Sequence, residues 1–98
     1  MDGSVRFEWD DAKAASNLAK HSVEFEFAIR VFLDETRADF DVSRAADGEL
    51  RRKAVGIIDG ELFAIVYTRR ANTVRLISAR RANVKENRIY ASVYPRSE

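Results

Sequence analysis

Two apolar runs flank an Asp-Gly pair in residues 51–68, which read RRKAVGIIDGELFAIVYT. An Asp-Gly pair between two such runs is a strong signal for a β-hairpin, because both residues tolerate the positive φ angles of a two-residue turn. We therefore expect strands at residues 51–58 and 61–68, joined by a turn at Asp59-Gly60. The second run is apolar almost throughout, which is typical of a central strand that is covered on both faces.

The residues before the hairpin predict a short strand and two helices. Alternation of apolar and polar residues predicts the strand at residues 5–9. Asp10 is suited to cap a helix that ends at Lys20-His21, where cations complement the negative end of the helix dipole. Ser22 is expected to cap the second helix. The apolar residues of this second helix recur with helical spacing at Phe25, Ala28, Ile29 and Phe32.

Segments that are apolar, or in which apolar and polar residues alternate, predict two more strands at 38–42 and 74–79. Polar residues predict a loop at 44–50 and a turn at 69–73. Asn83 and Glu86 form a capping-box pattern at the start of a final helix. Its apolar face comprises Ile89, Tyr90, Val93 and Tyr94, and Pro95 ends it. The order βααββββα, with short turns between consecutive strands, predicts an α+β fold whose helices cover an antiparallel sheet.

The length and composition favour a small protein without a bound cofactor. A chain of 98 residues is the size of one domain, which we place at residues 1–98. No apolar run approaches the roughly 20 residues that cross a bilayer, and the N-terminus lacks a secretory signal pattern. We therefore expect a cytoplasmic protein that does not contact the membrane. The absence of cysteine and the single histidine argue against a metal site.

Charge is divided unequally along the chain. Residues 1–50 carry six Lys and Arg against twelve Asp and Glu, whereas residues 51–98 carry eleven against four. Thirteen of the seventeen basic residues are arginine, which is suited to bidentate contacts with phosphate. This pattern indicates a surface that binds a polyanion. The alternative is that the two halves neutralise each other across the fold.

Basic and polar side chains gather near the strand ends of the predicted sheet. The hairpin register places Arg51 and Arg52 opposite Thr68 and Tyr67, and the next turn brings residues 75–80 alongside. Metal-free RNA cleavage needs a base for the 2′-hydroxyl proton, cations for the extra phosphorane charge and an acid for the leaving oxygen. Arginine supplies the cations, and Glu, His, Lys or Tyr can transfer the protons. By itself, this patch predicts binding of an anionic ligand.

Several residues outside the hairpin have both a structural and a functional interpretation. Histidine titrates near neutrality, so His21 is a candidate acid or base, yet its position also suits a stabilising cation at a helix C-terminus. Trp9 is either a packed aromatic or a base-stacking residue. Glu86 and Tyr90, four residues apart on the last helix, could form a hydrogen bond that faces the sheet. Alternatively, Glu86 only completes the capping box with Asn83.

Taken in order, the residues of the chain resemble the sequence pattern of BrnT toxins. The matching residues are Phe7-Glu8-Trp9-Asp10, Lys13, Asn17, Lys20-His21, Val23, Phe25, Glu49-x-Arg51, Gly56, Val66-Tyr67-Thr68, Arg75, Ser78-Ala79-Arg80, Glu86 and Tyr90. The resemblance covers about residues 5–90, and it is the combination that is specific. The sequence departs from the family pattern at Ser22, Glu35, Glu61, Ala45 and Ala46.

The resemblance implies a RelE-like fold and RNA cleavage that arrests translation. It also implies a BrnA-type antitoxin as partner, whose ribbon-helix-helix part would provide the only contact with DNA. Combining the patch with the resemblance, we assign candidate catalytic roles to Arg51, Tyr67, Thr68, Arg69, Arg80, His21 and Glu86. We assign candidate RNA-binding roles to Lys20, Arg52, Lys53, Arg70, Arg81, Trp9 and Tyr90. The alternatives to a ribonuclease toxin are a non-catalytic nucleic-acid-binding module and a module that only docks an acidic antitoxin.

Overall fold

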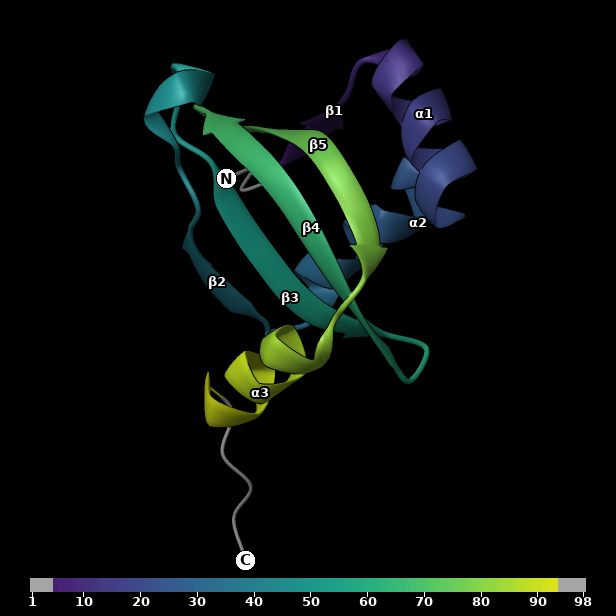
Figure 1. Cartoon of the computed structure of the whole chain (residues 1–98), viewed down its shortest axis with the longest axis vertical. Helices are drawn as coiled ribbons and strands as arrows, with labels where there is room; N and C mark the ends of the chain where they lie inside the picture. The colour runs from purple at the N-terminus through teal and green to yellow at the C-terminus, as the bar shows by residue number, and fades with distance from the viewer. Residues whose placement is uncertain (1–4, 94–98) are drawn as a thin grey trace, which may run out of the picture.

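A computed structural model describes residues 5–93, which form three helices and a five-stranded sheet (Figure 1). In chain order the elements are β1 (Arg6–Glu8), α1 (Asp11–His21), α2 (Phe25–Ala28), β2 (Ala38–Asp41), β3 (Arg52–Ile58), β4 (Glu61–Arg70), β5 (Thr73–Arg81) and α3 (Val84–Val93). A short 3₁₀ helix at Ile29–Leu33 continues α2, and another at Ala45–Asp47 lies in the predicted loop. The α+β class and the order βααββββα are therefore confirmed. Tyr94, predicted on the apolar face of the last helix, and Pro95, predicted to end it, lie outside the described residues.

The sheet is mixed, with the strand order β1-β5-β4-β3-β2. Its β1 strand runs parallel to β5, whereas the other neighbours are antiparallel. The prediction of an antiparallel sheet was therefore wrong for β1, which is far from β5 in the chain and is not joined to it by a short turn. The predicted hairpin is confirmed, because Asp59 and Gly60 have φ angles of 50° and 86° and Arg52 pairs with Tyr67. Positive φ at both turn residues matches the right-handed twist of the flanking strands, which explains the Asp-Gly pair at this position.

Two local predictions were wrong. Ser22 does not cap the second helix but ends α1, where it has a φ of 60° and its N–H donates to the Leu18 carbonyl at 2.9 Å. This left-handed conformation favours glycine. The turn predicted at 69–73 is shorter, because β4 continues to Arg70 and β5 begins at Thr73.

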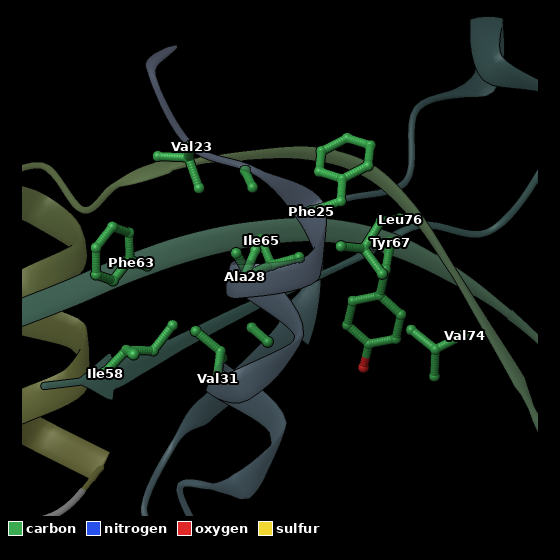
Figure 2. Packing of buried hydrophobic residues seen from close by; sticks show 12 residues of the cluster. Val23, Phe25, Ala28, Val31, Ile58, Phe63, Ile65, Tyr67, Val74 and Leu76 are labelled. Carbon is green, nitrogen blue, oxygen red and sulfur yellow. The ribbon is translucent and has the colours of Figure 1, made fainter. Parts of the chain in front are cut away.

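The main core lies between the sheet and the segment that contains α2. Phe25, Ala28 and Val31 from that segment are buried against residues such as Ile65 and Leu76 of the sheet (Figure 2). We call this side of the sheet the helix-covered face. On this face the apolar stripe predicted for the second helix packs against the central strand β4, which is buried as predicted.

Helix α3 lies on the other side of the sheet, at one end (Figure 1). Its Ile89 packs against a second cluster of buried residues formed by Ala38, Val55 and Ala64. We call this side the open face. Because α3 covers only one end, the rest of the open face presents side chains of β3, β4 and β5 to solvent.

A β-bulge in β5 decides which side chains reach the open face. The pairing with β4 shifts between Leu76 and Ser78, so Ile77 is an extra residue. Leu76 and Ala79 both belong to the core, whereas Ile77 and Ser78 both line hollows of the open face. The bulge therefore also places Arg80 on the open face, because the alternation of side chains restarts after it.

A side chain, rather than a strand, closes the outer edge of β5 beyond β1. The Asn17 amide donates to the carbonyls of Ala79 at 2.9 Å and Val23 at 3.0 Å, and its oxygen accepts from the Ala79 N–H at 3.0 Å. With only 7% of its surface exposed, Asn17 has all these polar groups paired. These bonds hold α1 against β5 and so fix where Lys20 and His21 lie.

Candidate functional site

Two adjoining hollows on the open face form one groove, which we call the open-face groove. The larger hollow, of about 310 Å³, is lined by Val42, Arg44, Asp47, Arg51, Lys53, Val66, Ile77 and Ser78. The smaller hollow, of about 190 Å³, is lined by Lys13, Ser16, Asn17, Lys20, His21, Ile77 and Ser78. Because both hollows share the two bulge residues Ile77 and Ser78, the C-terminal end of α1 and the start of β3 meet on one surface.

Two carboxylates hold Arg51 in the larger hollow. Its guanidinium contacts Glu49 at 3.1 Å and Asp47 at 3.6 Å, and a fifth of its side chain is exposed. Asp47 in turn pairs with Arg44 at 2.9 Å, and Arg70 lies 3.9 Å from Glu49. Three arginines thus surround two carboxylates at this end of the groove, which leaves a net positive charge that can attract phosphate.

Glu86, on α3, is an ion-paired carboxylate that is only 3% exposed and that contacts the groove residue Lys53. It accepts hydrogen bonds from Lys53 Nζ at 2.6 Å and from two Arg80 nitrogens at 2.8 Å each. The predicted capping box is confirmed, because the Asn83 N–H donates to Glu86 and the Glu86 N–H donates to Asn83. Burial by itself would raise the pKa of Glu86, but the bonds from Arg80, Lys53 and Asn83 outweigh it and lower the pKa to about 2.

His21 and Lys20 form the other end of the groove, at the end of α1. The His21 side chain is half-buried and makes no hydrogen bond with any residue between 5 and 93. Lys20 is exposed and forms no ion pair within the same part of the chain. Both side chains are therefore available to a ligand that lies over Ser78.

Tyr67 and Arg52 lie on the helix-covered face, away from this groove. The Tyr67 ring is buried in the core beside Val74 (Figure 2), and its hydroxyl donates to Asp39. Arg52 pairs with the same carboxylate. Burial and the hydrogen bond to Asp39 raise the pKa of Tyr67 to about 12. Sequence reasoning missed Asp39, which connects these two candidates.

The structure also separates other candidates from the groove. The buried Thr68 hydroxyl donates to the Leu50 carbonyl at 2.8 Å, which ties β4 to the loop before β3. Arg69 lines a hollow on the helix-covered face. Arg81 stacks 5.8 Å above the ring of Phe63, which belongs to the core on that same side. The predicted patch is therefore divided between the two faces of the sheet.

Trp9 and Tyr90 are held by contacts within the fold. Trp9 packs edge-on against Phe25 with ring centroids 5.8 Å apart, which favours the structural interpretation of this residue. The Tyr90 hydroxyl donates to Asp34 at 2.8 Å and lies 2.7 Å from Thr36 Oγ1. Burial raises the pKa of Asp34, but hydrogen bonds from Thr36, from the backbone and from Tyr90 outweigh it and hold the pKa below its usual value.

The candidate set omitted two basic residues that line the groove. Lys13 lies on α1 in the smaller hollow, and Arg44 lies in the larger one. Helical spacing could have identified Lys13, because Lys13, Asn17 and Lys20 are separated by four and three residues and so share one helix face. No comparable signal marks Arg44, since its loop has no regular period.

Ion pairs between the two halves of the chain explain part of the charge asymmetry. Besides Arg51 and Arg52, the second-half residues Arg70 and Arg75 pair with first-half carboxylates. Mutual neutralisation therefore accounts for several arginines, whereas Lys20 and Arg69 have no acidic partner within residues 5–93. Among these residues no three His, Asp or Glu side chains are grouped as metal ligands. None of the described helices is long and apolar enough to span a membrane.

Comparison with known proteins identifies the family. No curated protein matches the chain. However, the family model for the BrnT ribonuclease toxin of type II toxin–antitoxin systems matches residues 9–86. The matched region runs from the residues before α1 into α3 and includes all residues that line the open-face groove. The chain therefore belongs to the BrnT family of ribonuclease toxins of type II toxin–antitoxin systems.

Proposed function

We propose that this toxin cleaves RNA in the open-face groove without a metal ion and thereby arrests translation. The observation that carries the proposal is the shared bulge surface at Ile77 and Ser78. This surface brings Arg51, in the loop before β3, and Lys53, on β3, into one groove with His21 of α1. These elements supply cations and a titratable side chain on the same surface, which is the combination that metal-free phosphodiester cleavage requires.

In the proposed reaction the scissile phosphate lies over Ser78, between the two ends of the groove. Arg51 and Lys53 stabilise the additional negative charge of the phosphorane. His21 accepts the proton of the 2′-hydroxyl, whose oxygen attacks phosphorus. The bond from phosphorus to the 5′-oxygen breaks, and this oxygen leaves with a proton from Lys20 or water. The products are a 2′,3′-cyclic phosphate and a 5′-hydroxyl.

Two other candidates are poorly suited to transfer protons at neutral pH. Tyr67 is buried on the opposite face with a pKa of about 12. Glu86 is fully hydrogen-bonded and its pKa is about 2, so it neither releases nor readily accepts a proton in this range. We assign Glu86 a positioning role, because it holds the Lys53 and Arg80 side chains next to each other across β4.

We further propose that a BrnA-like ribbon-helix-helix antitoxin neutralises the toxin in the cytoplasm. Membership of a type II toxin–antitoxin family supports a protein partner. In this proposal the antitoxin provides the DNA contact of the complex. Co-expression with the protein encoded by the adjacent reading frame should restore growth to cells that produce the toxin. A toxin that remains fully active in a stable complex with that protein would contradict the proposal.

The decisive experiment incubates the purified protein with single-stranded RNA in the presence and absence of EDTA. We expect cleavage in both cases, with 2′,3′-cyclic phosphate ends, and loss of protein synthesis in a cell-free translation reaction. The Arg51→Ala variant, at equal concentration, controls for contaminating nucleases. Cleavage that EDTA abolishes and Mg²⁺ restores would refute the metal-free reaction. RNA binding without cleavage would instead support a non-catalytic module.

A further inference from the structure

We infer that a third hollow, next to His21 on the side away from the open-face groove, is a base pocket that selects guanine beside the scissile bond. This inference rests on the proposed ribonuclease function. The hollow has a volume of about 410 Å³ and lies between the end of α1, the start of α2 and the ends of β4 and β5. His21 lines both this hollow and the groove, so a nucleotide next to the cleaved phosphate can reach it.

Four of the nine residues that line this base pocket are apolar or aromatic. Leu18 and Val23 line one part, and Phe27 and Phe63 line another with ring centroids 5.3 Å apart. The Arg81 guanidinium lies 5.8 Å above the Phe63 ring. Unstacked RNA bases bind to such surfaces, because aromatic rings replace the stacking that the base loses on leaving its strand.

The polar groups of the pocket match the two hydrogen-bonding edges of guanine. The Glu24 side chain does not cap α2, and its carboxylate has no hydrogen-bond or ion-pair partner within residues 5–93. Its two oxygens can accept both the N1–H and the N2 amino group of guanine. Adenine and cytosine offer one amino group there, and uracil one imino group. On the other edge, Arg81 can donate to guanine O6 and N7, the commonest base contact of arginine.

Glu61 orients the arginine in this arrangement. Its carboxylate contacts Arg81 at 2.7 Å, which leaves other guanidinium N–H groups for the base. Glu61 is one of the positions at which the sequence departs from the family pattern, and its carboxylate adds a negative charge to the pocket rim. We therefore expect the base preference to be a property of this chain's own residues.

The test uses short RNAs that differ only at the bases flanking one cleavage site. We expect cleavage next to guanine to be about tenfold more efficient than next to adenine, cytosine or uracil. Replacing guanine with inosine, which lacks the N2 amino group, should remove most of this preference. Replacing it with 7-deazaguanine, which lacks N7, should remove part of it.

Two glutamate variants separate the pocket from general charge effects. Glu24→Gln should reduce the ratio of guanine to adenine cleavage to about threefold or less, because an amide cannot accept two hydrogen bonds from the same edge. Glu26→Gln is the matched control, since Glu26 is an exposed glutamate two residues further along, on α2, and does not line this hollow. It should leave the ratio unchanged. A ratio that is the same in Glu24→Gln and the wild type would overturn the inference.

Binding measurements keep this inference distinct from the proposed cleavage. RNAs with 2′-O-methyl groups lack the nucleophilic hydroxyl, so fluorescence anisotropy reports their affinity without reaction. We expect about tenfold tighter binding of the guanine RNA than of the inosine RNA. Equal affinities, together with uniform cleavage of all sequences, would refute the base pocket and leave the ribonuclease proposal standing. A guanine preference in binding without any cleavage of ordinary RNA would support the base pocket and refute the proposed cleavage.

Discussion

Replacing Glu86 with glutamine should cost about 3 kcal/mol of stability at neutral pH, and this cost should vanish near pH 2. The carboxylate is 3% exposed and accepts charged hydrogen bonds from Lys53 and Arg80. Glutamine has a similar shape and retains an oxygen for the Asn83 N–H. The substitution therefore removes mainly the charge interaction, while the cap and the packing persist.

The magnitude follows from the pKa of Glu86, which is lowered from 4.5 to about 2. A shift of this size corresponds to about 3 kcal/mol between the protonated and charged forms. Because the folded pKa lies below the unfolded one, the unfolded chain binds the proton first as the pH falls. The stabilisation from Glu86 is thus complete above about pH 4.5 and is lost between that pH and about pH 2.

Urea unfolding at pH 7, pH 4 and pH 2.5 measures the difference between the wild type and Glu86→Gln. The lowered pKa of Asp34 is shared by both proteins and cancels in this difference. Glu61→Gln is the control, because its ion pair with Arg81 is exposed at 54% and 67% and should contribute less than about 1 kcal/mol. A Glu86→Gln difference that is equally large at pH 7 and pH 2.5 would refute the reasoning.

Four further substitutions test the groove and the end of α1. Arg51→Ala should reduce RNA cleavage by about tenfold to a hundredfold. Arg69→Ala, on the opposite face, is the control and should change cleavage less than threefold. Equal losses of cleavage in the two variants would contradict the placement of the groove. His21→Gln should lower the rate of RNA cleavage about a hundredfold, and a wild-type rate would remove His21 from the reaction. Ser22→Gly should raise the free energy of unfolding by about 1 kcal/mol, because the φ of 60° at this position favours glycine. Thermal unfolding measures this difference, and an unchanged or lower stability would contradict the prediction.

Local chemistry made several elements predictable from the sequence. The Asp59-Gly60 turn and the capping box of Asn83 and Glu86 each depend on residues close together in the chain, and both are confirmed. The family resemblance over residues 5–90 is also confirmed, by the match at 9–86. Ser22 was misplaced because serine suits a helix start, whereas here it ends α1 in a left-handed conformation and its N–H donates to the Leu18 carbonyl.

The sequence by itself determined the hairpin, the element order and the basic character of the second half, because these follow from neighbouring residues and composition. Only the tertiary structure decided which side chains share a face. Side chains alternate along a strand, so the single extra residue Ile77 in β5 directs Ser78 and Arg80 to the open face. Likewise, α1 lies beside β5 through Asn17, and this contact across the fold brings His21 to the groove. Both depend on pairing between distant segments, which no local pattern of residues encodes.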